Sequence, residues 1–397
     1  MSAVLVINSG SSSFKYQLID MESERPLATG LVERIGEGSG HTTHEGPNGK
    51  DERTLEIPDH TAGFRAMLDA FEAYGPRLAE FPPVAVGHRV VHGGKRFFEP
   101  TVVTPLVEIN IEDLADLAPL HNPANLEGIR AAEKAFPHVP HVAVFDTAFH
   151  QTLAPEAYTY AIDAELAEKY RVRRYGFHGT SHKYVSQTAA QFLGRPLGEL
   201  KQIVLHLGNG ASACAIDGGR SVDVSMGMTP LEGLVMGTRS GDIDPAVLFH
   251  LARRANLDTD ALDELLNRKS GLLGLSGYGD MRDVQNAADS GDPDARLALD
   301  TYLHRLKHYI GAYIAILGGL HVLTFTAGVG ENSAAVRAGA LAGLEALGIR
   351  LDAARNAERG RGARVISTDG SPVTVLVVPT DEELEIARQT LSAIGAG

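Results

Sequence analysis

The chain has 397 residues, 36 basic and 50 acidic side chains, a formal net charge of -14 at pH 7 and 44% apolar residues. This length and apolar content fit two or three globular domains and exclude global disorder. The acidic balance excludes broad electrostatic binding to nucleic acid or to an anionic membrane, so any anionic ligand must be held by local arginines. Cys214 is the only cysteine, which excludes an intramolecular disulfide, a tetrathiolate metal site and a redox pair. A reduced, cytoplasmic setting is expected.

Apolar periodicity predicts strands that alternate with helices along the whole chain. Strands are expected near 3–8, 14–20, 27–34, 84–88, 141–145, 203–207, 212–217, 322–327 and 373–378. Helices are expected near 61–74, 123–136, 181–193, 244–254, 296–317, 333–346 and 381–393. This pattern predicts two α/β domains, residues 1–150 with 383–397 and residues 151–382, and a ligand site in the cleft between them.

Several local signals refine this assignment. The N-terminus leads directly into a β run without a basic segment, so no secretory signal is expected. The apolar stretch at 309–320 is shorter than the roughly twenty residues that span a bilayer. It is expected to be a buried helix that ends at Gly318-Gly319. Asn122, as an N-cap before Pro123, predicts a helix start and places His121 in the preceding loop.

The segment 36–53 is rich in glycine and charge and has no apolar period. We expect an exposed loop without chemistry. Its two histidines, His41 and His44, lack a third ligand in the sequence nearby, so we expect solvated side chains rather than a metal site.

Two segments about two hundred residues apart share one design. In each, at 4–15 and at 203–212, a buried-type strand breaks into glycine and small hydroxyl or amide residues, and a second strand follows. Each segment predicts a tight hairpin whose glycines let the backbone approach a ligand closely, with N–H groups directed at negative charge. A matched pair of such hairpins, one in each half of the chain, suggests a duplicated architecture that grips a polyphosphate.

These two segments resemble the paired signatures of the acetate kinase family, within the sugar kinase, heat-shock protein and actin superfamily. Further motifs of that family occur in order over nearly the whole chain, at 87–94, 120–123, 145–150, 174–182, 237–242, 328–332 and 380–383. The resemblance implies two duplicated ribonuclease H-like (actin-like ATPase) domains in a homodimer. It also implies reversible phosphoryl transfer from ATP to acetate, giving acetyl phosphate and ADP.

Phosphoryl transfer depends on positioning and charge neutralisation, and planar guanidinium groups suit the equatorial oxygens of the transferring group. By resemblance, Arg89 orients the acetate carboxylate or the acyl phosphate, Arg239 contacts the group in flight and His178 donates a hydrogen bond to it. The family treats Asp146 as catalytic. Acetate at neutral pH has no proton for a general base to remove, however, so we expect Asp146 to organise the metal shell through a water and to hold Arg89.

The resemblance also implies ligand sets for the metal, the nucleotide and the acyl group. Magnesium, with manganese as an alternative, bridges the phosphates of ATP or ADP, and Asn8 and Glu382 match the metal positions. The small apolar acyl pocket corresponds to Val91, Leu120, Phe177 and Pro230. The nucleotide positions are Lys15, His206, Leu207, Gly208, Asn209, Gly210, Asp280, Met281, Arg282, Gly328, Val329, Gly330, Glu331 and Asn332.

Alternative functions are separated by particular residues. An actin-like scaffold keeps both hairpins but does not need Arg89, Arg239 and His178. A dinucleotide-dependent oxidoreductase is disfavoured because no glycine fingerprint opens a helix after the first strand. Propionate kinase stays open, since one methylene in an apolar pocket changes binding by only about 1–3 kcal/mol.

Overall fold

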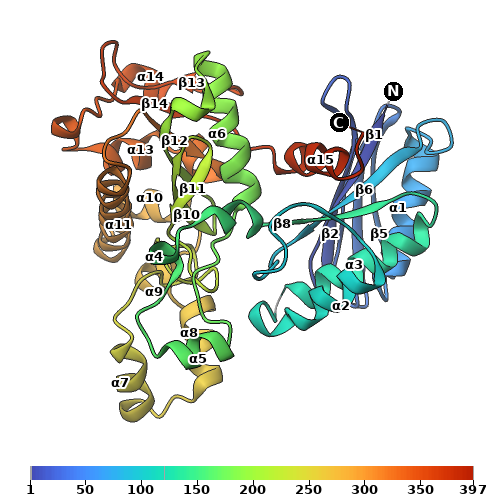
Figure 1. Cartoon of the computed structure of the whole chain (residues 1–397), viewed down its shortest axis with the longest axis horizontal. Helices are drawn as coiled ribbons and strands as arrows, with labels where there is room; N and C mark the ends of the chain where they lie inside the picture. The colour runs from blue at the N-terminus through green and yellow to red at the C-terminus, as the bar shows by residue number, and fades with distance from the viewer. Residues whose placement is uncertain (1, 120, 397) are drawn as a thin grey trace. The chain divides into compact units, whose positions relative to one another are not determined.

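The computed structural model describes residues 2–119 and 121–396. The chain separates into two compact units (Figure 1). Unit 1 contains the residues up to Phe149 and those from Asp381 onward, and unit 2 is His150–Thr380. Among the described helices, none combines the length and the apolar content needed to cross a membrane.

Unit 1 is built on an eight-stranded sheet with the order β5-β4-β3-β2-β1-β6-β8-β7. Strands β1 to β5 form an antiparallel meander, β1, β6 and β8 are parallel, and β7 is antiparallel to β8. The strands are β1 (Ala3–Ser9), β2 (Ser13–Asp20), β3 (Arg25–Glu33), β4 (Gly40–Gly46), β5 (Gly49–Leu55), β6 (Pro83–Val90), β7 (Thr101–Val102) and β8 (His141–Phe145).

Helices cover both faces of this sheet. On one face α1 (His60–Tyr74) and α3 (Asn122–Ala135) pack on each other, and Val86 joins the core that includes Phe14 and Phe64. The next residue, Gly87, points to the opposite face. There a Cβ atom would lie 2.4 Å from Thr390 Oγ1 of α15 (Glu382–Ala393), so glycine is required for the helix to pack this closely. The remaining helix of the unit is α2 (Pro105–Asp113).

The expectation of an exposed loop at 36–53 is wrong, because β4 and β5 occupy this segment. The inward positions of β4 are Gly40, Thr42 and His44, which are buried although none is strongly apolar. His44 Nε2 donates to Gly75 O at 2.9 Å, and His44 Nδ1 accepts from the Tyr16 hydroxyl at 2.9 Å. Both ring nitrogens of His44 therefore have hydrogen-bond partners inside the unit. Because the buried positions of β4 are glycine or polar residues, this strand shows no apolar periodicity in the sequence.

The start of α3 also differs from the expected cap. Asn122 is the first residue of α3, and His121 precedes it without a side-chain cap. The Asn122 side chain accepts from His92 N–H at 3.1 Å and donates to His92 O at 3.0 Å. Asn125 accepts from Val91 N–H at 3.0 Å and donates to Ser9 O at 2.6 Å. The two asparagines thus fix the segment that follows β6.

Unit 2 repeats the plan of unit 1 on a six-stranded sheet with the order β11-β10-β9-β12-β14-β13. Strands β9, β10 and β11 form an antiparallel meander, and β9, β12 and β14 are parallel, as are β1, β6 and β8. The expected pair of hairpins is therefore present at β1–β2 and β9–β10. The strands are β9 (Lys201–Leu207), β10 (Ala211–Asp217), β11 (Arg220–Val224), β12 (Val322–Thr326), β13 (Arg364–Val365) and β14 (Thr374–Val377).

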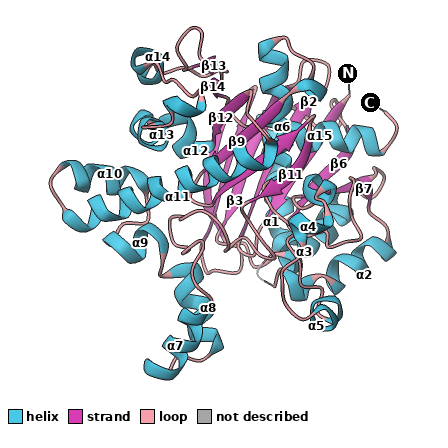
Figure 2. Cartoon of the chain, turned by 60° about the vertical axis from the view of Figure 1, so that its left-hand side comes forward, coloured by secondary structure: helices cyan, strands magenta, loops and turns pink. Residues whose placement is uncertain are grey.

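Two long helices pack on this sheet. Helix α6 (Gly179–Leu193) contacts β9 and β12, and α11 (Pro293–Leu317) contacts β10. The expected stop of α11 is confirmed, since Gly318 adopts a left-handed conformation at φ +63. A helical excursion that includes α7 and α8 extends away from the strands (Figure 2). The other helices are α4 (Pro155–Tyr158), α5 (Ala164–Lys169), α7 (Ala246–Arg254), α8 (Thr259–Arg268), α9 (Gly271–Ser276), α10 (Met281–Asp289), α12 (Ala327–Asn332), α13 (Ala334–Leu341) and α14 (Ala353–Ala357).

A buried pair of histidines makes the stability of unit 1 depend on pH. His141 Nε2 donates to Phe136 O, so its Nδ1 accepts from His88 Nε2–H at 2.9 Å. Burial and the neighbouring His141 lower the pKa of His88 well below its ordinary 6.5. A depressed histidine pKa contributes stability that is present above pH 6.5 and is lost as the pH falls, because the unfolded chain takes up the proton first.

We therefore expect the free energy of unfolding to fall between pH 7.5 and 5.5, by up to about 1.4 kcal/mol per pH unit for each such histidine. His88→Gln keeps a donor for His141 but has no titrating ring, so its stability should decrease less steeply. Urea unfolding at several pH values measures this slope, with His138→Gln, an exposed histidine of the same unit, as the control. Equal slopes for His88→Gln and the parent chain would contradict the assignment.

Candidate active site

The predicted site residues of unit 1 lie at one edge of its sheet. Asn8 lies near the end of β1, Arg89 near the end of the parallel strand β6, and Asp146 directly after β8. Glu382 is the first residue of α15. The carboxyl ends of parallel strands meet at a common edge, where α/β folds place their ligands. The strand order therefore brings Asn8, Arg89 and Asp146 together.

Arg89 and Asp146 form a bidentate ion pair. Arg89 Nη2 donates to Asp146 Oδ2 at 2.6 Å, and Arg89 Nε donates to Oδ1 at 3.1 Å. Arg89 Nη1 donates to Asn8 Oδ1 at 3.3 Å. Burial alone would lower the pKa of Arg89, but the Asp146 and Glu382 carboxylates outweigh it and raise the pKa. Asp146 is only 1% exposed, so it fixes the plane of the guanidinium rather than facing solvent.

The same edge offers oxygen donors of the kind that magnesium prefers. The pKa of Glu382 is raised to about 7, chiefly by burial, with Asp146 and Glu383 contributing to the rise and Arg89 and Lys15 opposing it. Asn8 provides an amide oxygen, and Lys15 lies opposite Asn8 in the register of β1 and β2. Within the described residues no group of three or more His, Cys, Asp or Glu side chains could hold a metal by itself. The oxygen donors of Asn8 and Glu382 suit Mg²⁺, which keeps several waters and uses ligand phosphates.

In unit 2, His178 and Arg239 approach the second glycine hairpin. A Cβ built on Gly210 would lie 3.5 Å from Arg239 Nη1 and 3.7 Å from His178 Nε2, so both side chains reach the same glycine. His178 precedes α6 in a left-handed conformation at φ 55, which is uncommon for a residue with a side chain. Its ring stacks on His206 of β9 with centroids 4.2 Å apart.

A buried serine connects His178 to a second histidine. Ser212 Oγ lies 2.9 Å from His178 Nδ1 and 2.8 Å from His182 Nε2. His182 is 0% exposed, and its Nδ1 has no hydrogen-bond partner among the described residues. An orphaned buried N–H is rarer than an unused lone pair, so His182 carries its hydrogen on Nε2 and donates it to Ser212. Ser212 then donates to His178 Nδ1, which leaves the hydrogen of a neutral His178 on Nε2.

The positive charge of Arg239 has no carboxylate partner within the part of the chain that the structure describes. Arg239 Nη1 donates to Pro230 O at 3.1 Å and lies 3.7 Å from the Met236 sulfur. Burial lowers its pKa, which still leaves a guanidinium charged at neutral pH. Arg239 is therefore available to an anionic ligand.

A cavity of about 740 Å³ lies in unit 2 beside the second hairpin. Its volume is in the range of small-molecule and cofactor sites. Nine of the predicted nucleotide residues line it, namely Gly208, Asn209, Asp280, Met281, Arg282, Gly328, Val329, Glu331 and Asn332. Segments far apart in the chain meet closely here. A Cβ on Gly237 would lie 1.9 Å from Asn209 Oδ1 and 2.7 Å from Gly279 O, so only glycine permits this approach.

The remaining predicted residues lie elsewhere. His206, Leu207, Gly210 and Gly330 belong to unit 2 but do not line the cavity, and Lys15 lies on β2 of unit 1. Of the predicted acyl residues, Val91 belongs to unit 1, whereas Phe177 and Pro230 belong to unit 2. Leu120 lies outside the described residues.

Sequence reasoning missed much of the cavity lining. The largest missed group comes from the part of the chain between α10 and β13 and includes Gln285, Tyr302, Ser333, Arg337, Arg359 and Arg364. Arg337 is 2% exposed and donates to Gly330 O, Glu331 O and Asn356, so it holds α12 in place. One local feature of the sequence, the arginine-rich run at 359–364, could have indicated this part of the lining. It lacks the glycine motif by which the other nucleotide segments were identified.

The repeated sheet plan, the two glycine hairpins and the cavity are features of the two-domain actin-like ATPase fold, which confirms the expected fold class. Comparison with known proteins narrows this class. The sequence profile of the Acetokinase family matches residues 3–388, and the chain belongs to that family. An acetate kinase from Leifsonia xyli subsp. xyli is 77% identical over 397 residues, which is 100% of each chain.

Two solved structures are also similar over nearly their whole length. The structure of Porphyromonas gingivalis acetate kinase is 46% identical with a TM-score of 0.95, covering 99% of this chain and 100% of that one. The structure of a propionate kinase from Francisella tularensis subsp. tularensis SCHU S4 is 40% identical with a TM-score of 0.92 and the same coverage.

Proposed function

We propose that the chain catalyses the reversible transfer of the terminal phosphoryl group of ATP to acetate, giving acetyl phosphate and ADP. The observation that carries the proposal is the uncompensated Arg239 beside His178 at the second glycine hairpin. A transferring phosphoryl group spreads negative charge over its equatorial oxygens, and a planar guanidinium can contact two of them at once. The family and the 77% identical acetate kinase support the choice of acetate.

In unit 2, Arg239 contacts the transferring group and His178 donates a hydrogen bond to it from Nε2. The Ser212 bond supports this role because it leaves the hydrogen of His178 on that nitrogen. The cavity takes the base and ribose of the nucleotide, between the segments of Asp280 and Gly328. The glycines at 208 and 210 let the backbone N–H groups of the hairpin approach the phosphates.

In unit 1, Arg89 orients the carboxylate of acetate or the acyl phosphate. Asn8, Glu382 and, through a water, Asp146 would hold a magnesium ion, which would neutralise part of the phosphate charge. Asp146 acts on the reaction by holding Arg89 rather than as a general base. The resemblance to the family assigns Val91, Phe177 and Pro230 to binding of the methyl group of acetate, together with Leu120, which lies outside the described residues.

Acetate is favoured over propionate by the comparisons. The curated acetate kinase is 77% identical, whereas the propionate kinase of known structure is 40% identical. An actin-like scaffold is disfavoured because it has no use for a carboxylate-held Arg89 and an uncompensated Arg239.

The substrate is tested by incubating the protein with ATP, Mg²⁺ and acetate, propionate or butyrate, and trapping the acyl phosphate as a hydroxamate. We expect the highest rate with acetate and the lowest with butyrate. The expected discrimination per methylene is about 10- to 200-fold, the range for an apolar pocket. ATP hydrolysis without any hydroxamate would instead support the scaffold.

The role of Asp146 is tested with Asp146→Asn, which keeps the shape but loses the charge that holds Arg89. We expect turnover to fall about 10–100-fold, the usual cost of losing a group that orients a ligand-binding residue. The KM for acetate should rise, as should the magnesium concentration for half-maximal rate, and saturating metal should recover part of the activity.

A matched control for this variant lies on the surface of the same unit. Arg388 and Glu24 form the same bidentate arrangement at 2.7 and 2.6 Å, and Glu24→Gln should leave all three parameters unchanged. A general base at Asp146 would predict unchanged metal dependence and loss of the acidic limb of the pH–rate profile. An unaltered magnesium requirement in Asp146→Asn would thus refute the proposed role.

We also propose that the enzyme works in the cytoplasm as a homodimer, as the resemblance to its family implies. Cytoplasmic work suits an enzyme that consumes ATP and whose one cysteine is buried. Light scattering on the purified protein measures the assembly, and a mass of one chain at micromolar concentration would refute the dimer.

A further inference from the structure

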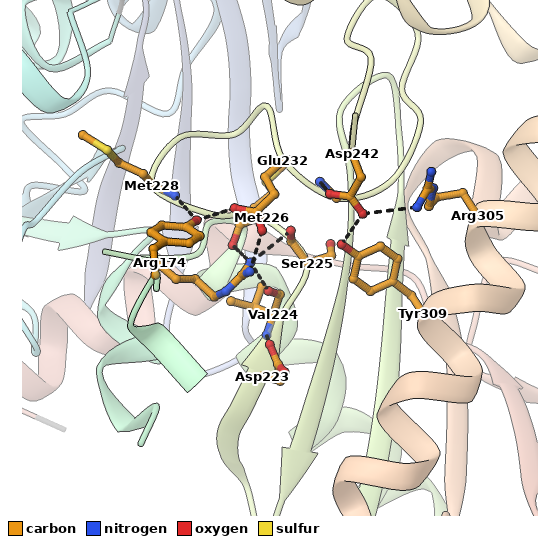
Figure 3. A network of polar contacts seen from close by, with 12 residues as sticks. Arg174, Asp223, Val224, Ser225, Met226, Met228, Glu232, Asp242, Arg305 and Tyr309 are labelled. Carbon is orange, nitrogen blue, oxygen red and sulfur yellow. Dashed lines mark hydrogen bonds and ion pairs between the residues drawn. The ribbon is translucent and has the colours of Figure 1, made fainter. Parts of the chain in front are cut away.

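The segment that carries Pro230 and Arg239 has no regular secondary structure of its own. It begins after β11 ends at Val224 and continues to α7 at Ala246. A loop of this length without helix or strand is uncommon inside a compact unit and must be fixed by side chains if its residues are to keep one position. The polar contacts in Figure 3 show how this segment is fixed.

Arg174 ties the beginning of the segment to the rest of unit 2. Its Nη1 faces three successive carbonyls, at 2.8 Å from Val224 O, 3.1 Å from Met226 O and 3.3 Å from Ser225 O (Figure 3). Its Nη2 donates to Glu232 Oε1 at 2.5 Å. Arg174 lies four residues before His178. The ion pair therefore joins the segment of His178 to the segment of Arg239.

Glu232 is held from a second direction by Tyr160, whose hydroxyl donates to Glu232 Oε2 and accepts from Met228 N–H at 3.1 Å. Burial raises the pKa of Tyr160, so the hydroxyl keeps its proton and acts as the donor. Both oxygens of the Glu232 carboxylate therefore accept a hydrogen bond.

Asp242 ties the end of the segment in a similar way. Its Oδ1 accepts from Gly233 N–H at 2.8 Å, which closes residues 233–242 into a loop around Arg239. Its Oδ2 accepts from the Tyr309 hydroxyl at 2.7 Å and lies 3.5 Å from Arg305 Nη1, both on α11 (Figure 3). The loop is thus attached to the long helix that packs on the sheet.

We propose that these two attachments, Arg174 and Tyr160 on Glu232, and Tyr309 and Arg305 on Asp242, position Arg239 for phosphoryl transfer. We call them the brace. The Pro230 carbonyl to which Arg239 Nη1 donates lies two residues before Glu232, so a shift of the segment moves the guanidinium with it. The brace residues act through Arg239 and need not touch the substrate. The inference rests on the proposed function for the role of Arg239.

The test is a cycle of variants in the full chain, with Glu232→Gln, Tyr309→Phe and Arg239→Ala. Glu232→Gln keeps the size of the side chain but removes the charge that pairs with Arg174. Tyr309→Phe removes one hydroxyl and leaves the ring packed beside Tyr313, at 5.5 Å between centroids. We expect Glu232→Gln and Tyr309→Phe each to lower kcat about tenfold or more, since a small misplacement of a catalytic group has effects of this order. The KM for ATP should change less, because Gly237 is the one residue of this segment among those that line the cavity.

The decisive measurement is the effect of Glu232→Gln in an Arg239→Ala background. If the brace acts through Arg239, the second substitution should lower kcat by less than about twofold there, because residues that act as a unit are not additive. Tyr309→Phe provides the same test if Glu232→Gln does not fold. Asp369→Asn, which removes an exposed ion pair with Arg355 at 2.8 Å in the same unit, is the control and should leave kcat unchanged.

Each outcome has a distinct meaning. Full additivity of Glu232→Gln and Arg239→Ala, or a lower melting temperature with unchanged kcat, overturns the brace as a positioning device. Near-parent turnover in Arg239→Ala overturns the proposed role of Arg239 instead, and with it the basis of the inference.

Discussion

In the proposed mechanism, the chemistry depends on keeping the half-buried Arg239 charged and unneutralised. Arg239 lies only a few residues along the chain from the carboxylates of Glu232 and Asp242, and either could cancel its charge. Both carboxylates are already engaged, by Arg174 and Tyr160 in one case and by Tyr309, Arg305 and Gly233 N–H in the other. Among the residues that the structure describes, the hydrogen-bond partners of Arg239 are a carbonyl and a sulfur. The proposed brace therefore keeps both carboxylates away from Arg239 in addition to fixing the backbone. The carbonyl that remains as its partner orients the guanidinium without neutralising it.

The two units use one sheet plan to support two different kinds of arginine. In unit 1 the strand ends place Arg89 against Asp146, and the bidentate pair fixes the guanidinium while cancelling much of its charge. Such an arginine is suited to orient a carboxylate that carries a single charge. In unit 2 the corresponding strands carry the glycine hairpin and His206, and the cation comes from the long loop after β11. A half-buried charge without a paired carboxylate is costly, and under the proposed function the nucleotide phosphates pair with it.

The sequence predicted what is encoded locally and missed what depends on contacts between distant segments. The strand, glycine and strand pattern located both hairpins, and Gly318 marked the end of α11, because backbone conformation at these positions is decided by neighbouring residues. His44 was misassigned because its burial depends on Tyr16 and on the backbone of Gly75. Glu232 is 58 residues from Arg174, and neither belongs to a recognisable pair in the sequence. Tyr302 and Arg337 reach the cavity only through the packing of α11 and α13.

Burial also determines the protonation and hydrogen bonding of the histidines of unit 2 before any ligand binds. Burial and the neighbouring His150 and His206 lower the pKa of His182 well below 6.5. His182 is therefore neutral, and its single ring hydrogen, on Nε2, is donated to Ser212. The Ser212 hydroxyl donates a hydrogen bond to His178 Nδ1, and a neutral His178 then presents Nε2–H. His178 can therefore donate to a phosphoryl oxygen without first becoming protonated. In the proposed mechanism, the positive charge at the transferring group comes from Arg239, because the protonation of arginine does not change over the physiological pH range.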